Sequence, residues 1–158
     1  TRPIREGETD GVEYFFTSSE KLEQFKNSGK IVELRTYETV MGPWSYFTMD
    51  DGQFDIHGEG DCLMIGTLES YEKMCRYYGN GALVPVYIEV PDGIRLLRAV
   101  KREGKQKNPN YREVCRRYLA DEDDFSEELL SRLRIGKRFS NTDLEACLEE
   151  ILKEMESH

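Results

Sequence analysis

Apolar and polar residues follow one another along the first forty residues in short patterns that predict strands and one helix. The segment 18–29 opens on serine, spaces Leu22 and Phe25 three residues apart and closes on glycine, which is the pattern of a short capped helix. The aromatic and threonine run at 14–17 predicts a strand before this helix, and the alternating run at 30–38 predicts a strand after it.

Within the second strand, the alternation separates two faces. Ile31, Glu33, Arg35 and Tyr37 are expected on one face, and Val32, Leu34 and Thr36 on the other. An unpaired carboxylate in such an apolar stretch would be costly, so Glu33 is expected to have a partner. From the residues alone, Glu33 either meets a ligand, pairs with Arg35, or faces water at a sheet edge.

The middle of the chain continues this alternation of elements. Residues 61–65 predict a buried strand that runs into a loop, and residues 69–81 predict a helix closed by glycines. The buried stripe of that helix is expected to consist of Tyr71, Met74, Cys75 and Tyr78. Residues 82–92 are rich in branched side chains, which is typical of a parallel strand covered on both faces.

The last third predicts three helices and a strand. Two helices are expected within 94–125, joined by the helix-breaking run at 104–110, and a strand followed by a helix is expected within 133–155. Ser140 or Thr142 is expected to cap the final helix, whose predicted buried stripe is Leu144, Leu148, Ile151, Leu152 and Met155. Strands that alternate with helices in this way favour a three-layer α/β fold.

Composition supports one domain with a real core, because the chain has 158 residues, of which 38% are apolar. No apolar run approaches the length needed to span a membrane, and no secretory leader is visible, so we expect a cytoplasmic protein that does not bind membranes. The four cysteines show no C-x-x-C spacing, which predicts reduced, structural thiols and no zinc site.

Charge is distributed unevenly. The net charge of -9 argues against a nucleic-acid partner, yet residues 95–117 alone carry nine basic and two acidic residues. That segment has a charge of +7, so the remainder carries -16. A concentrated cationic segment on an acidic protein is suited to clamping a polyphosphate, although an amphipathic helix with a solvated basic face gives the same pattern.

The first sixteen residues contain a second candidate anion site. Arg2 and Arg5 can both fork onto one phosphate, because each guanidinium presents paired donors that match two anionic oxygens, and Tyr14 can add a hydroxyl donor. Pro3 and two glycines restrict the backbone of this run. The alternative is a solvated basic tail.

The spacing of these residues, T-R-P-x-R-x-G-E-x-D-G-x-x-Y-x-F, resembles the nucleoside-monophosphate-binding segment of guanylate kinases. The resemblance implies that Arg2, Arg5 and Tyr14 hold the phosphate of GMP and that Glu8 orients the site. The run I-V-E-L is similar to the strand whose glutamate accepts hydrogen bonds from guanine, which implies this role for Glu33.

Further along, the run W-S-Y-F-T is similar to the family's N-Y-Y-G-[ST], reached after a few extra residues. The resemblance implies that Tyr46 contacts the phosphate and that Thr48, with Ser45 as the competing choice, supplies a hydroxyl near the base. The family's two aspartates in D-x-D-x-x-G are replaced, and Thr67 stands where a hydroxyl would substitute for one of them.

The cationic segment is similar to the family's mobile lid, which implies that Arg98, Arg102 and Arg117 neutralise charge on the transferred phosphoryl group, with Arg116 able to substitute for its neighbour. The pattern N-T-D-L-E-x-A is similar to the family's adenine-contacting segment, and Asn141 is the matching asparagine. On its chemistry alone, Asn141 is equally suited to capping a helix.

Taken together, the resemblance implies one α/β domain with a three-layer P-loop-kinase-like fold, a parallel sheet, a GMP-binding insertion (1–49), a core (50–97 and 119–158) and a helical lid (98–118). The implied activity is transfer of phosphate from ATP to GMP with Mg²⁺ bound to the ATP, by a monomer or homodimer. The family's G-x-x-G-x-G-K-[ST] loop has no match, which leads us to expect a segment preceding this sequence. The alternative function is a non-catalytic module that binds a phosphopeptide or a partner protein through the GMP pocket.

Overall fold

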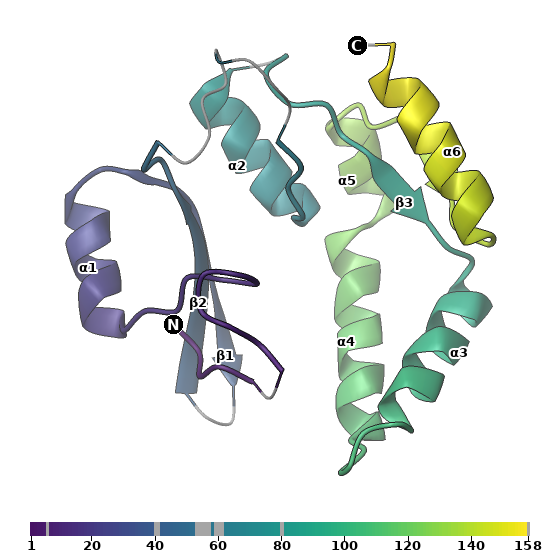
Figure 1. The fold of residues 1–158 in the computed structure, drawn as a ribbon, viewed down its shortest axis with the longest axis horizontal. Coiled ribbons are helices and arrows are strands. Elements are labelled where there is room, and N and C mark those ends of the chain that lie inside the picture. Colours follow the sequence, from purple (N-terminus) through teal and green to yellow (C-terminus); the bar gives the residue numbers. More distant parts are fainter. Residues whose placement is uncertain (6, 40–41, 53–57, 59–61, 80, 158) are drawn as a thin grey trace. The chain divides into compact units, whose positions relative to one another are not determined.

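The computed structural model describes residues 1–5, 7–39, 42–52, 58, 62–79 and 81–157 (Figure 1). The chain mixes helices and strands and divides into two compact units. The first unit contains residues 1–65 and 72–82, and the second contains residues 66–71 and 83–158. Each unit holds one two-stranded sheet, antiparallel in the first unit and parallel in the second.

The centre of the first unit is a β-hairpin. Strand β1 (Ile31–Thr39) pairs antiparallel with β2 (Gly42–Met49), which confirms the strand predicted at 30–38. The pairing register shifts between Ile31 and Glu33, so Ile31 lies opposite Met49 while Glu33 lies opposite Thr48. The prediction that Ile31 shares the face of Glu33 is therefore wrong, because a bulge interrupts the strict alternation on which it relied.

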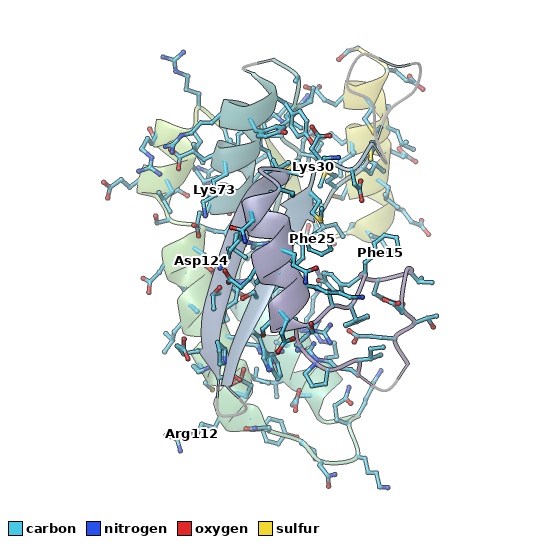
Figure 2. The ribbon with its side chains drawn as sticks, turned by 90° about the vertical axis from the view of Figure 1, so that its left-hand side faces the viewer. Phe15, Phe25, Lys30, Lys73, Arg112 and Asp124 are labelled. Carbon is cyan, nitrogen blue, oxygen red and sulfur yellow. The ribbon has the colours of Figure 1, made fainter. Side chains whose placement is uncertain are left out.

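Helix α1 (Ser19–Asn27) covers one face of this hairpin (Figures 1 and 2). Ser18 caps it by accepting a hydrogen bond from the Lys21 amide, and the chain turns away at Gly29 with a φ of 69°. Leu22 is buried, and the ring of Phe25 lies 5.9 Å from that of Phe47 on β2. The predicted helix is confirmed together with both of its ends.

Residues 14–17 form no strand, contrary to the sequence prediction. Tyr14 makes one isolated bridge with Asp10, and the Gly11 amide donates to the Tyr14 carbonyl at 2.8 Å. Gly11 has a φ of 82°, which a glycine adopts without strain, and the Asp10 carboxylate accepts from the Phe16 amide. These local bonds close a turn-rich loop and leave the aromatic run without a strand partner among the described residues.

Helix α2 (Leu68–Tyr78) is confirmed where the pattern predicts a helix, and it ends before Gly79, whose φ is 94°. Met74 on its predicted stripe is buried. The predicted buried strand before it is wrong for the part that the structure describes, since residues 62–67 have no regular structure and Ile65 is fully exposed. An apolar run forms a strand only where another strand satisfies its amides, and no strand among the described residues pairs with this run.

The sheet of the second unit consists of β3 (Tyr87–Glu89), which pairs in parallel with β4 (Arg138–Ser140). Helices α3 (Asp92–Glu103) and α4 (Tyr111–Asp124) form the predicted helical hairpin (Figure 1), and α5 (Glu127–Arg132) follows. Ile88 is about half exposed, so β3 is not covered on both faces as its composition predicts. The core of this unit is Leu68, Leu130 and Ile135.

Helix α6 (Leu144–Met155) confirms the final predicted helix but not its details. Its N-cap is Asp143, which accepts from the Ala146 amide at 2.9 Å, rather than Ser140 or Thr142. Leu144, Leu148 and Leu152 are exposed, whereas Cys147 is buried and Ile151 and Met155 are half-buried. The buried side is thus shifted toward Cys147, and the prediction is wrong for the three leucines. The apolar pattern alone does not say which side of this helix the rest of the unit contacts.

Two small sheets in separate units fit the mixed α/β class, and the three-layer arrangement around one parallel sheet stays a prediction. Among the helices formed by described residues, none combines the length and the apolar character required to cross a membrane.

Candidate functional site

A buried carboxylate lies at the centre of the hairpin. Glu33 is 4% exposed, and each of its two oxygens accepts one side-chain hydrogen bond. Thr48 Oγ1 donates to Oε1 at 3.1 Å from the facing strand, and Arg35 Nε donates to Oε2 at 3.1 Å from the same strand. The prediction that Glu33 has a partner is confirmed, and Arg35 is one such partner. One acceptor position per oxygen remains for further donors.

The pairing register gathers the candidate residues on one face of the hairpin. Thr48 lies opposite Glu33 and Tyr46 opposite Arg35, so these four residues share a face. Ser45, the competing choice for the hydroxyl, lies opposite Thr36 on the other face and shares a 2.9 Å hydrogen bond with its hydroxyl. The structure thus brings Thr48, and not Ser45, to the Glu33 carboxylate.

Arg2 and Glu8 form a closed pair in the N-terminal loop. Arg2 Nη1 donates to Glu8 Oε2 at 2.7 Å and Nη2 donates to Oε1 at 2.5 Å, and the Arg5 amide also donates to Oε2 at 2.8 Å. These bonds, that of Arg2 first, lower the pKa of Glu8 from 4.5 to about 2. Glu8 therefore holds the Arg2 guanidinium in one orientation.

Arg2 is buried among aromatic rings. Its guanidinium carbon lies 5.3 Å from the ring centre of Tyr14 and 5.2 Å from that of Phe16, and it is 6.0 Å from that of Tyr46 on β2. Arg2 Nε is buried and has no hydrogen-bond partner in the described part of the chain. A buried donor without a partner is costly, so this nitrogen is suited to an acceptor oxygen that a ligand brings.

Arg5 stands in contrast to Arg2, because its side chain is exposed and makes no hydrogen bond to the residues that the structure describes. The first unit thus holds the oriented guanidinium of Arg2, the exposed guanidinium of Arg5, two tyrosines and a buried carboxylate with hydroxyl and guanidinium partners. This set can bind a ligand that carries an anion at one end and adjacent hydrogen-bond donors at the other.

The second unit brings Arg98 to Asn141. Arg98 Nη1 donates to the Asn141 carbonyl at 2.8 Å and to its side-chain Oδ1 at 3.4 Å, and Nη2 donates to the Thr142 carbonyl at 3.3 Å. The Asn141 amide donates to the Glu89 carbonyl, which places Asn141 where β3 and β4 end. Open parallel sheets bind ligands at this carboxyl end. Since Asp143 caps α6, the alternative capping role of Asn141 is not observed.

The other candidate arginines of the cationic segment are arranged differently. Arg102 is exposed on α3, one turn beyond Arg98 on the same side of the helix. On α4, Glu113 accepts from Arg117 Nε at 2.8 Å and from Arg116 Nε, also at 2.8 Å. The hydrogen bonds from Arg116 first, and then from Arg117, lower the pKa of Glu113 to about 2, although burial acts in the opposite direction, so this carboxylate holds both arginines at neutral pH.

Thr67 lies in the second unit, whereas Glu33 lies in the first. Its hydroxyl accepts from the Ser70 amide at 3.4 Å and its carbonyl accepts from the Tyr71 amide, so Thr67 begins helix α2.

One structural role was not assigned from the sequence, whereas the pairing of Arg35 with Glu33 was among the alternatives because a glutamate and an arginine two residues apart on a strand share a face. Arg95 was counted only as part of the cationic segment; it forms an ion pair with Glu122 and lies over the Tyr118 ring at 4.4 Å, joining α3 to α4.

Comparison with curated proteins matches 153 residues, 96% of this chain, to 75% of a guanylate kinase from Salinibacter ruber (strain DSM 13855 / M31), with 28% identity. The chain is similar to a guanylate kinase. No protein-family model matches the chain. The similarity extends over nearly the whole sequence, including both Glu33 and Arg98, and it suggests the family that the N-terminal motif resembles.

Proposed function

We propose that this protein is a guanylate kinase, which transfers the γ-phosphoryl group of ATP to GMP and yields ADP and GDP. The observation that carries this proposal is the buried Glu33 carboxylate, held by Thr48 and Arg35 on the hairpin face that also presents Tyr46. The similarity to a guanylate kinase supports the same function.

Guanine is the base that fits this carboxylate. It presents its N1–H and its exocyclic amine side by side, and each can donate to one oxygen of Glu33. Adenine has no such pair of donors on that edge, so it would leave the buried carboxylate without new partners. Sites built to accept a hydrogen bond reject analogues that lack the donor, because a buried polar group is then unpaired.

The phosphate of GMP would be bound by Arg2 and Arg5 with the hydroxyls of Tyr14 and Tyr46. Arg2 is already oriented by Glu8, and its buried Nε lacks a partner among the described residues. Preorganised donors lose little conformational entropy when the anion arrives, whereas the exposed Arg5 side chain would order on binding. Binding by both arginines places two positive charges at the acceptor phosphate.

For the donor nucleotide, Asn141 would contact adenine, and Arg98, Arg102 and Arg117 would neutralise the charge on the transferred phosphoryl group. The interactions of Arg98 with the Asn141 loop and of Arg117 with Glu113 would be exchanged for nucleotide contacts. The acceptor phosphate is ionised near neutral pH and needs no general base.

Magnesium would enter with ATP. No group of three or more His, Cys, Asp or Glu side chains within the described residues is placed to hold a metal ion, so the chain's own contribution is to position the phosphates with arginines. When bound, Mg²⁺ would shield the charge of the β- and γ-phosphates.

GMP recognition can be tested directly on this chain by calorimetry, with Trp44 fluorescence as a second probe because Trp44 lies two residues from Tyr46 on the same face of β2. GMP is expected to bind at least about tenfold more tightly than AMP, and Glu33→Gln is expected to remove most of this preference. Glu38→Gln is the matched control, since Glu38 is exposed on the same strand. Equal binding of the two nucleotides by the unmodified protein would contradict the proposal.

Phosphoryl transfer needs a loop that cradles the ATP phosphates, and these 158 residues contain no G-x-x-G-x-G-K-[ST] motif. This observation favours, as a second candidate, a non-catalytic module that binds a phosphorylated peptide through Arg2 and Arg5. Formation of ADP that depends on added GMP would support the kinase. Binding of a phosphoserine peptide at the expense of GMP, with no such ADP formation, would support the module.

A further inference from the structure

Arg35 occupies a position from which it can control how Glu33 presents its carboxylate. The two residues lie on one face of β1, and Arg35 Nε donates to Glu33 Oε2 at 3.1 Å. Both side chains are shielded from water, with 17% of the Arg35 side chain and 3% of the Glu33 side chain exposed. An ion pair that is this well shielded is screened little by salt and is held in a defined geometry.

The torsion that orients a glutamate carboxylate is intrinsically soft, because rotation about the bond to an sp² carbon has broad minima. Here the two oxygens are held from different directions, Oε1 by the hydroxyl of Thr48 across the hairpin and Oε2 by Arg35 along the strand. These two donors define the plane of the carboxylate. They leave one acceptor position on each oxygen, which matches the two adjacent donors of guanine.

We propose that Arg35 is a positioning residue for base selectivity: by holding Oε2 of Glu33, it aligns the buried carboxylate with the two adjacent donors of a guanine base. This inference rests on the proposed GMP-binding function and adds to it a residue that acts through Glu33. Arg35 contributes charge as well as direction, since its guanidinium neutralises a carboxylate that is otherwise costly to bury.

The test measures the dissociation constants of GMP and AMP by calorimetry for the full chain and for Arg35→Met, Arg35→Lys and Arg76→Met. Methionine keeps the apolar stem of arginine and removes its donors, and Arg76 is the control because it is an exposed arginine of the same unit. Arg35→Met is expected to reduce the preference for GMP over AMP about tenfold, the effect of one charge-assisted hydrogen bond, with AMP affinity unchanged within about threefold.

Arg35→Lys is expected to recover part of the preference, because lysine restores the positive charge but not the side-on donor of arginine. This variant also provides the test if Arg35→Met does not fold, which circular dichroism would show. In the Glu33→Gln background, Arg35→Met is expected to change the preference by less than about twofold, since its effect passes through the carboxylate.

A parallel loss of GMP and AMP affinity in Arg35→Met would overturn the inference, because it would place Arg35 at the phosphate or in the general stability of the hairpin. An unchanged preference in a folded Arg35→Met variant would also overturn it. Failure of the unmodified protein to prefer GMP is a different result, which contradicts the proposed function itself and the inference with it.

Discussion

The core of the second unit gives the sharpest test of which apolar residues support the fold. Leu130 on α5 is 1% exposed and packs with Leu68 and Ile135. Leu130→Ala removes a fully buried side chain and leaves a cavity, which costs about 2–5 kcal/mol of unfolding free energy. For a chain of this length, that loss lowers Tm by about 4–20 °C.

The matched control is Leu152→Ala on α6. It makes the same chemical change in a helix, but Leu152 is 56% exposed. Less than half of the residue is buried in the folded protein, so the substitution removes little buried surface and leaves no cavity. The expected cost is about 1 kcal/mol or less, because complete burial of a leucine contributes about 1.5–3 kcal/mol. The two variants therefore separate burial from the loss of a leucine as such.

Urea unfolding followed by far-UV circular dichroism measures both costs, and equal slopes of the transitions would show that the unfolded states are comparable. The sequence pattern alone predicts that Leu152 belongs to a buried stripe, whereas the structure places it at the surface. If Leu152→Ala destabilises the protein as much as Leu130→Ala, then the α6 face is covered and the burial assigned to it is wrong.

Two further predictions concern local interactions. The pKa of Glu8 is lowered from 4.5 to about 2, mainly by its bond to Arg2, so the stabilisation that ionised Glu8 provides is complete above pH 4.5 and is lost as the pH falls toward 2. Urea unfolding across this pH range should therefore show a weaker pH dependence of stability in Glu8→Gln than in the unmodified protein. Identical pH profiles of the two proteins would contradict the pairing of Glu8 with Arg2. Asp143→Ala should lower the free energy of unfolding by about 1 kcal/mol, because it removes the cap that accepts from the Ala146 amide, whereas Thr142→Ala should lower it little. Thermal melts measure both effects, and a larger loss in Thr142→Ala would assign the capping role to Thr142.

Periodicity was sufficient to locate most elements. The helix at Ser19–Asn27 and the strand at Ile31–Thr39 follow from residues that are close in sequence, namely a serine cap, a glycine stop and an alternating run. The helical hairpin of α3 and α4 follows in the same way from a helix-breaking run between two helical patterns. These signals depend only on neighbouring residues, so the sequence alone is enough to detect them.

The errors concern properties that depend on a partner elsewhere in the chain. The apolar runs at 14–17 and 62–65 have strand composition, but a strand also needs a neighbour to accept its amide bonds. The displaced stripe of α6 has the same origin, since leucines at helical spacing show that a helix forms but not which side meets the core. The bulge beside Val32 was likewise invisible, because a one-residue shift leaves the composition unchanged.

The candidate site was predictable to the extent that chemistry required it. The cost of burying Glu33 predicted a partner, and the pairing of β1 with β2 supplied a second one in Thr48, whereas Ser45 lies opposite Thr36. The sequence could not predict which arginine of each charged segment is buried and paired and which is exposed. Arg2 and Arg5 are alike in type, yet the structure makes Arg2 a buried, oriented group and Arg5 an exposed one.

This difference has a functional consequence for both charged segments. Arg2, Arg98 and Arg117 are each held by an acceptor of the chain itself, namely the Glu8 carboxylate, the Asn141 and Thr142 carbonyls and the Glu113 carboxylate. In the proposed complex, a nucleotide would have to replace these hydrogen bonds at Arg98 and Arg117. At Arg2 it could instead accept from Nε, which has no partner among the described residues, and leave the bond to Glu8 intact. Under the proposed function, the site around Arg2 would therefore be the better preorganised of the two. GMP recognition would then be a property of the first unit, and Arg98 and Arg117 would rearrange when the donor nucleotide binds.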